Sequence, residues 1–99
     1  MIDNPPKTLE EAVKWIVYEL NDKDKKTLAS CLTDREMIGK THHGLGTSIR
    51  NSFGLWGANE ELVADLLKHS GEEKFQCVGD DACAVLLSKL WETLREEHE

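Results

Sequence analysis

Apolar residues recur at intervals of three and four along the chain, and this spacing constrains the fold more than any other feature of the sequence. The clearest stripe consists of Leu9, Val13, Ile16 and Leu20. Side chains at this spacing share one face of a helix, whereas no segment alternates apolar and polar residues as a half-buried strand does. The sequence therefore predicts an all-α fold, a compact bundle of four to five short helices with a Gly-rich break after the third helix.

Signals for helix ends divide the chain further. Thr8 with Glu11, and Thr33 with Glu36, match the capping box, in which a hydroxyl and a carboxylate satisfy backbone N–H groups at a helix N-terminus. Gly71 suits the left-handed position that follows a helix. The expected helices begin at Leu9, near Lys23, at Asp34, after Asn59 and after Asp80 or Asp81.

Length and charge limit the classes of function. We expect residues 1–99 to form a single helical domain, with flexible ends at 1–7 and 95–99. Twelve basic and nineteen acidic residues give a net charge of −7, which argues against direct binding to duplex nucleic acid. The acidic excess serves solubility, or it marks a surface that mimics nucleic acid or docks on a basic partner.

The lengths of the apolar runs and the number of cysteines both favour a cytoplasmic protein. No apolar run is long enough to cross a membrane, so no membrane association is expected. The three cysteines are an odd number and contain no Cys-x-x-Cys pair, which favours reduced thiols over a disulfide framework or a zinc finger. We therefore expect a cytoplasmic protein.

The stretch 41–59 contains two of the four histidines and a group of glycines. If the third helix runs unbroken through residue 53, a turn of about 100° per residue places His42 and Arg50 on one side, with Gly46 between them. Each glycine inside a helix costs about 1 kcal/mol relative to alanine, so another interaction should compensate. Two interpretations stay open: close packing of a neighbouring element over the glycines, or a notch that binds an anionic group.

In the ligand interpretation, the binding residues are His42, Gly44, Gly46, Arg50, Asn51 and Trp56. After a helix break at Gly54, Leu55 and Trp56 are expected to fold back into the core, unless the Trp56 ring stacks on a ligand or partner. Adjacent histidines point about 100° apart on a helix, and His42-His43 is not part of a His-Glu-x-x-His pattern. The sequence also lacks a dinucleotide or P-loop fingerprint, so we expect no metal and no cofactor.

The run from 42 to 57, H-x-G-L-G-x-x-I-R-N-x-x-G-L-W-G, resembles the signature of a family of small phage and bacterial proteins of unknown function. Asp80-Asp81 and Trp91 match an Asp pair and a Trp of a closing helix, so the resemblance extends over about residues 8–94. It implies a compact helical domain of phage or prophage origin and no established activity. Thr47-Ser48 replaces bulkier apolar residues, which makes the motif more polar than is usual in the family.

We expect a small non-enzymatic interaction or adaptor protein that acts through protein–protein contacts. The alternative is a binding protein for a small anionic ligand or nucleotide at the face of His42, Gly46 and Arg50. A third hypothesis is a small enzyme that uses His42 as a general base. Trp15 and Tyr18 lie off the main apolar stripe of the first helix, where they cover a second helix or form the contact of a homodimer.

Overall fold

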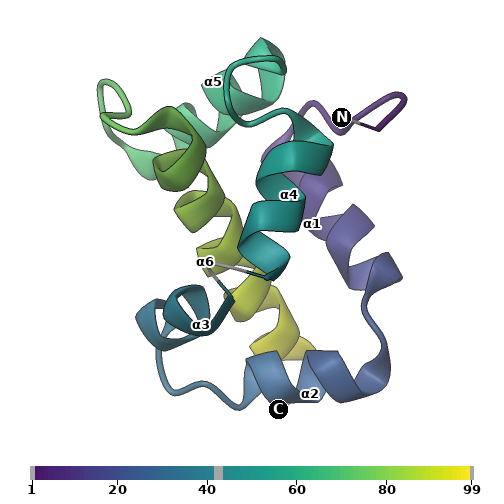
Figure 1. Ribbon diagram of the computed structural model, residues 1–99. Coiled ribbons are helices and arrows are strands. Elements are labelled where there is room, and N and C mark those ends of the chain that lie inside the picture. Colours follow the sequence, from purple (N-terminus) through teal and green to yellow (C-terminus); the bar gives the residue numbers. More distant parts are fainter. Residues whose placement is uncertain (1, 42–43, 99) are drawn as a thin grey trace.

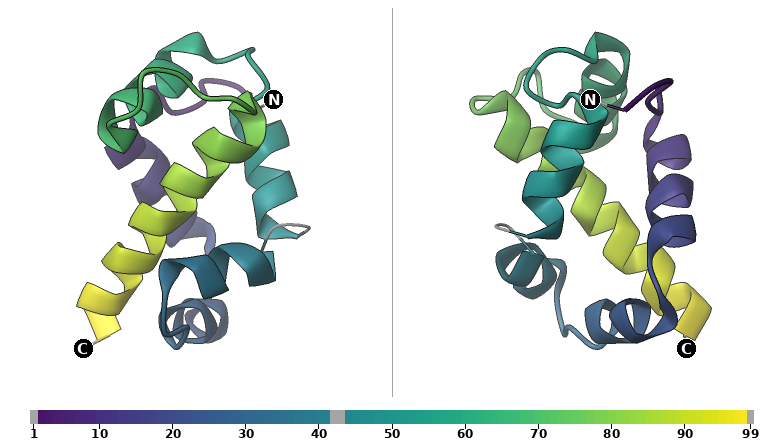
Figure 2. Two further views of the ribbon diagram at one scale, coloured as in Figure 1. Left: turned by 90° about the vertical axis from the view of Figure 1, so that its left-hand side faces the viewer. Right: turned by 45° about the vertical axis from the view of Figure 1, so that its right-hand side comes forward.

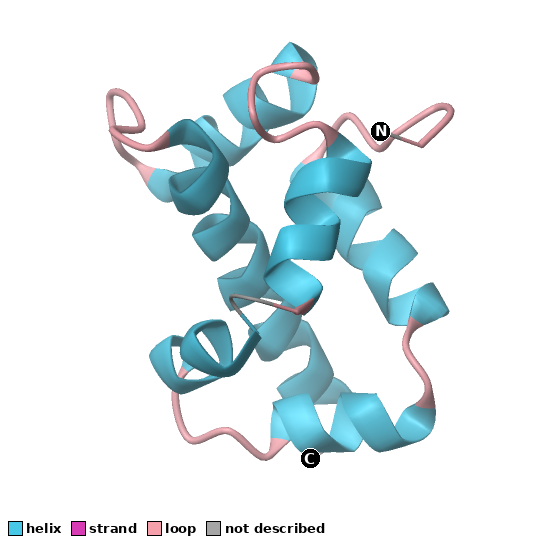
Figure 3. Ribbon diagram, in the orientation of Figure 1, coloured by secondary structure: helices cyan, strands magenta, loops and turns pink. Residues whose placement is uncertain are grey.

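The longest helix passes through the centre of the molecule, and the other helices pack against it (Figures 1 and 2). The computed structural model describes residues 2–41 and 44–98. The helices of this part are α1 (Leu9–Glu19), α2 (Asp22–Ala29), α3 (Asp34–Thr41), α4 (Leu45–Phe53), α5 (Glu60–Ser70) and α6 (Val78–His98). The same residues contain no strand (Figure 3), and none of their helices is both long and apolar enough to cross a membrane. The predicted all-α class is confirmed.

Thr8 and Thr33 cap α1 and α3 as predicted. Thr33 Oγ1 accepts a hydrogen bond from Glu36 N (3.1 Å) at the start of α3, and α1 begins in the same way after Thr8. The glutamate of each box reaches one residue further back than in the standard motif. The Glu36 carboxylate accepts from Leu32 N (2.9 Å), and this bond holds the pKa of Glu36 below its ordinary value.

The third helix does not run unbroken through residue 53, so the condition set for the geometry of His42 and Arg50 is not met. Helix α3 ends at Thr41 and α4 begins at Leu45, and between them Gly44 leaves the helical region with φ −103° and ψ −94°. The two helices run in different directions over α6 (Figure 1), so each can pack on it separately. The bundle therefore has six helices in its described part rather than four to five. The geometry expected for His42 no longer applies, and His42 and His43 lie outside the described residues.

The second break in the motif was predicted and is confirmed. Gly54 follows α4 in the left-handed conformation (φ 70°), which glycine adopts without strain. Its neighbour Leu55 is fully buried, as expected of a residue that folds back into the core. Gly71 ends α5 in the same left-handed conformation (φ 78°), again as predicted.

Helix α6 begins earlier than its predicted cap. Its first residue is Val78, and neither Asp80 nor Asp81 precedes it. Instead, the Asp81 carboxylate reaches back from the first turn and accepts hydrogen bonds from Gln76 N and Cys77 N, both at 3.0 Å. The aspartate still satisfies free N–H groups at a helix N-terminus, where a negative charge is favourable. Only the position of the helix boundary was misjudged.

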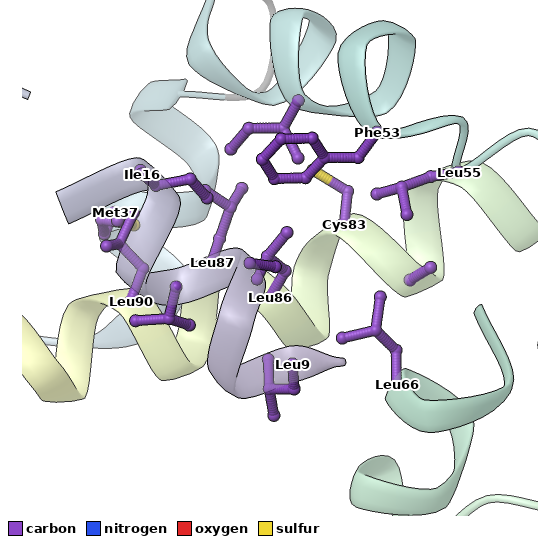
Figure 4. Packing of buried hydrophobic residues seen from close by; sticks show 14 of the residues in the cluster. Leu9, Ile16, Met37, Phe53, Leu55, Leu66, Cys83, Leu86, Leu87 and Leu90 are labelled. Atoms are coloured by element: carbon purple, nitrogen blue, oxygen red, sulfur yellow. The ribbon is translucent and has the colours of Figure 1, made fainter. Parts of the chain in front are cut away.

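The predicted wide apolar face of α6 forms the middle of the core (Figure 4). Its residues that are at most 1% exposed are Ala82, Cys83, Leu86, Leu87, Leu90 and Leu94. The surrounding helices contribute side chains such as Ile16, Met37, Phe53 and Leu66. Burial of each large apolar side chain contributes about 1.5–3 kcal/mol, so this cluster is the main source of stability.

One buried polar residue joins three segments at the end of the molecule near the N-terminus. The Asn59 side chain is buried, and its Nδ2 donates to Pro6 O (2.9 Å) and to Phe53 O (3.0 Å). Its Oδ1 accepts from Leu62 N (3.3 Å) as the predicted N-cap of α5. Asn59 thus connects the chain ahead of α1 to the end of α4 and to the start of α5.

Candidate functional site

Arg50 lies where α4 meets the start of α6. Its side chain is almost fully buried, its Nη1 lies 3.7 Å from Asp80 Oδ1, and its Nη2 donates to Thr47 Oγ1 (2.9 Å). The guanidinium carbon lies 5.8 Å from the centre of the Trp56 ring, within the range of a cation–π contact. A buried charge is costly unless it is paired, and Asp80 provides the opposite charge.

Gly46 leaves the space that Arg50 occupies. A Cβ at this position would lie 3.0 Å from the Thr41 carbonyl oxygen and 3.3 Å from Arg50 Nη1. The Gly46 carbonyl oxygen in turn accepts from Cys83 Sγ on α6 (3.6 Å). At Gly46, the Thr41 backbone therefore packs closely against the helix. This agrees with the interpretation in which the glycines allow close packing of a neighbouring element.

Trp56 covers the first turn of α6. A Cβ added to Gly79 would overlap the Trp56 ring, so only glycine allows this approach. The Trp56 side chain is nevertheless 58% exposed, which corrects the prediction that it enters the core. We call Gly46, Arg50, Trp56, Gly79 and Asp80 the α4–α6 joint.

The structure brings together three of the six predicted ligand residues. Gly46, Arg50 and Trp56 belong to the joint, whereas Gly44 and Asn51 are exposed on the surface. His42 lies outside the described residues. Gly79 and Asp80 were not predicted as partners of the motif, and the Asp pair at the start of α6 was the signal that could have suggested an arginine contact.

The cysteines near the joint are poor nucleophiles. Burial raises the pKa of the Cys83 thiol to about 11, although the nearby Arg50 charge opposes this effect. The exposed Cys77 thiol donates to Asp80 Oδ2 (3.3 Å), and this bond and the carboxylate charge raise its pKa as well. Because the thiolate is the reactive form, neither cysteine is activated at neutral pH.

A groove of about 420 Å³ lies between α1 and α4. We call it the α1–α4 groove, and its apolar lining consists of Ile2, Trp15, Ile16, Leu20, Leu45, Ile49 and Phe53. The Trp15 ring meets the Phe53 ring edge to face, with 6.1 Å between the centroids and 82° between the planes. Trp15 is still 40% exposed, and Tyr18, one turn further along α1, is 87% exposed. The volume falls within the range of roughly 300–1,000 Å³ that is usual for ligand pockets.

Only one wall of this groove was predictable from the sequence. Trp15 and Tyr18 were recognised as aromatic residues off the main stripe of α1. The other wall, including Leu45, Ser48 and Ser52, was missed because the sequence left open whether the third helix ends before Leu45. The spacing of Leu45, Ser48 and Ser52 on one face of α4 is the signal that was available.

A larger groove of about 1,170 Å³ runs along α6 beside α1, α3 and α5. Its rim carries both signs of charge, and some of these charges pair locally. Lys14 lies 3.2 Å from Glu10, and Lys89 lies 3.7 Å from Glu92. Such a rim has no single charge to select a partner. Within residues 2–41 and 44–98, no three His, Cys, Asp or Glu side chains come together as a metal site.

A family model described as "Domain of unknown function (DUF6794)" matches residues 5–94. The chain belongs to this family. The expected membership of a family of unknown function is thereby confirmed, while the motif as its signature and the phage or prophage origin stay predictions. No curated protein and no solved structure matches the chain.

Proposed function

We propose that the protein is a small non-enzymatic interaction protein that binds a protein partner through the α1–α4 groove. The observation that carries this proposal is the exposure of two aromatic residues of α1: Trp15, which lines the apolar groove, and Tyr18, which lies one turn further along the helix. Tyr and Trp are enriched among the residues that contribute most to binding energy at protein interfaces. The resemblance to small phage and bacterial proteins supports a phage or prophage origin for this interaction protein.

The α4–α6 joint supports the alternative less well. In the anionic-ligand hypothesis, the positive charge of Arg50 attracts the ligand, but the Asp80 carboxylate already lies 3.7 Å from the guanidinium. An incoming anion would meet this negative charge. The contacts of Gly46, Arg50 and Trp56 instead support a structural role for the motif, namely the attachment of α4 to α6.

The proposal is tested by site-specific photo-crosslinking followed by affinity measurement. A benzoylphenylalanine at position 18 and a control at position 73, an exposed residue after α5, are irradiated in a lysate of the organism that encodes the protein. The crosslinked protein is identified and purified, and its affinity for the wild type and for single variants is measured by calorimetry.

We expect crosslinking from position 18 only, and at least tenfold weaker binding of the purified partner by Tyr18→Ser or Trp15→Ala. Leu32→Ser is the matched control, because Leu32 is 80% exposed but lies between α2 and α3, on neither of the helices that form the groove. Equal affinity of all three variants would overturn the proposal. Stabilisation by nucleotides or small acids that disappears in a folded Arg50→Ala variant would favour the anionic-ligand alternative instead.

A further inference from the structure

We infer that the segment bound in the α1–α4 groove is a basic amphipathic helix of the partner. This inference rests on the proposed protein-binding function and specifies the chemistry of the bound segment. Three features of the groove carry it: the backbone of its walls, the side chain that already occupies one end, and the charge of its rim.

The walls favour a helix over an extended segment. Both walls are helices, and most of their backbone N–H and C=O groups bond within the helix. The Ser52 carbonyl of α4 is an exception, and it already accepts from Ile2 N. An extended segment would find no free strand edge beside it, so most of its own backbone groups would lose hydrogen bonds to water without replacement. A helix satisfies these groups internally and presents apolar side chains at i, i+3, i+4 and i+7. Helix α4 has nine residues and is about 14 Å long, which matches two to three turns of a bound helix.

One end of the groove already holds an aliphatic side chain from this chain. Ile2 lines the groove and is half-buried, and its backbone N donates to Ser52 O (2.9 Å) at the end of α4. The seat of Ile2 therefore shows which side chains the groove accepts. The remaining lining near Trp15, Leu20 and Leu45 is of the same apolar kind, and it is available for leucine or isoleucine of a partner.

The rim of the groove is negative on one side and uncharged on the other. On α1, the exposed Glu19 lines the groove one turn after Trp15. The exposed Glu11 lies one turn before Trp15, outside the lining, and its carboxylate accepts from Lys7 N (3.1 Å). On α4, the rim carries the hydroxyls of Ser48 and Ser52. Lysine or arginine on the flank of a bound helix would face the glutamates. The net charge of −7 works in the same direction, because it repels a second copy of this chain, anionic membranes and nucleic acids.

The test is a display selection from a library of helical peptides. Leucine is fixed at i, i+3, i+4 and i+7 of a 16-residue helix, and the other positions vary among Lys, Glu, Gln and Ala. The full-length wild type is compared with two variants of equal charge change, Glu11→Lys/Glu19→Lys at the groove and Glu73→Lys/Glu97→Lys at exposed sites outside it. The best peptide is then measured by fluorescence anisotropy, with a scrambled peptide of the same composition as control.

We expect lysine enrichment for the wild type and for the Glu73→Lys/Glu97→Lys variant, and its loss for Glu11→Lys/Glu19→Lys. The reference is the affinity of the wild type for the selected peptide. We expect the groove variant to bind this peptide at least tenfold more weakly, and the wild type to bind the scrambled peptide at least tenfold more weakly. Enrichment of glutamate, no enrichment, or equal binding of the scrambled peptide would overturn the inference.

The two proposals fail separately. If a natural partner crosslinks at position 18 and depends on Trp15, but no basic helix is selected, the inference fails and the protein-binding function stands. If no partner depends on the groove, the proposed protein-binding function fails, and the basic-helix inference fails together with it. A dimer of the protein that is crosslinked through position 18 would identify a second copy as the occupant and overturn the basic-helix inference.

Discussion

Helix α4 has two faces that meet different surroundings. Toward α6 it forms a closed joint, in which Gly46 and Arg50 are buried and the charge of Arg50 is balanced by Asp80. Toward α1 it forms one wall of an open apolar groove beside the exposed Trp15 and Tyr18. The conspicuous sequence motif thus belongs mainly to the face that holds the fold together. The face that is free to bind is lined by less conspicuous residues.

The largest effect should come from removing the charge that the joint buries. We expect Arg50→Ala to lower the free energy of unfolding by about 3 kcal/mol, because it leaves Asp80 without its partner and opens space between α4 and α6. Asp80 is partly exposed, which keeps the loss at the low end for a broken buried pair. Urea unfolding measures the change. Lys14→Ala, which breaks an exposed pair, serves as control and should have little effect.

A pH series should show how tightly the joint encloses Cys83. Burial raises its pKa from 9.0 to about 11 in the folded protein, so folding favours the protonated thiol. The resulting stabilisation is complete below pH 9 and is lost as the pH rises toward 11. Relative to Cys83→Ser, which lacks the titrating thiol, the wild type should lose about 2 kcal/mol over this range. Parallel stability curves of the two proteins between pH 8 and pH 11 would show that the thiol is not enclosed.

Two glycines in helices should respond with opposite signs to the same substitution. Gly46→Ala places a Cβ against the Thr41 carbonyl oxygen, so we expect a net loss of about 1 kcal/mol despite the better helix propensity of alanine. At Gly39 in α3, nothing lies within 4 Å of an added Cβ. Gly39→Ala should therefore stabilise the protein by about 1 kcal/mol. Thermal unfolding measures the stability of both variants relative to the wild type. Stabilisation by both substitutions would argue against close packing at Gly46.

The smallest effect on stability should come from the groove side. Tyr18 is 87% exposed, and we expect Tyr18→Ser to change the free energy of unfolding by less than about 0.5 kcal/mol. Chemical denaturation tests this directly. A larger loss would mean that Tyr18 supports the fold, and the contrast between the closed and open faces of α4 would then be weaker than described.

Local signals predicted most of the helices, because capping depends on residues that are neighbours in sequence. Thr8, Thr33 and Asn59 each accept the hydrogen bond expected of an N-cap. The split between α3 and α4 was not predictable in the same way. Glycine at position 44 would destabilise the interior of a helix but is well tolerated at the N-cap position. The packing of α3 and α4 on α6 decides between the two.

The candidate site depended even more on long-range packing. The pair of Arg50 and Asp80 joins positions thirty residues apart, and no periodicity connects them. The groove required knowledge of which face of α4 turns toward α1. The fact that residue 56 is a tryptophan does not predict how far it is buried. The Trp56 ring covers the backbone of Gly79, yet more than half of Trp56 stays exposed.

The Asn59 carboxamide has a consequence for how the molecule opens. Since this one group bonds to Pro6, Phe53 and Leu62, none of the three segments can separate alone without leaving a buried amide or carbonyl unsatisfied. The residues before α1, which would fray by themselves, therefore share the lifetime of the first turn of α5. A protease that must draw the chain near Pro6 into its active site has to wait for this whole end of the protein to unfold.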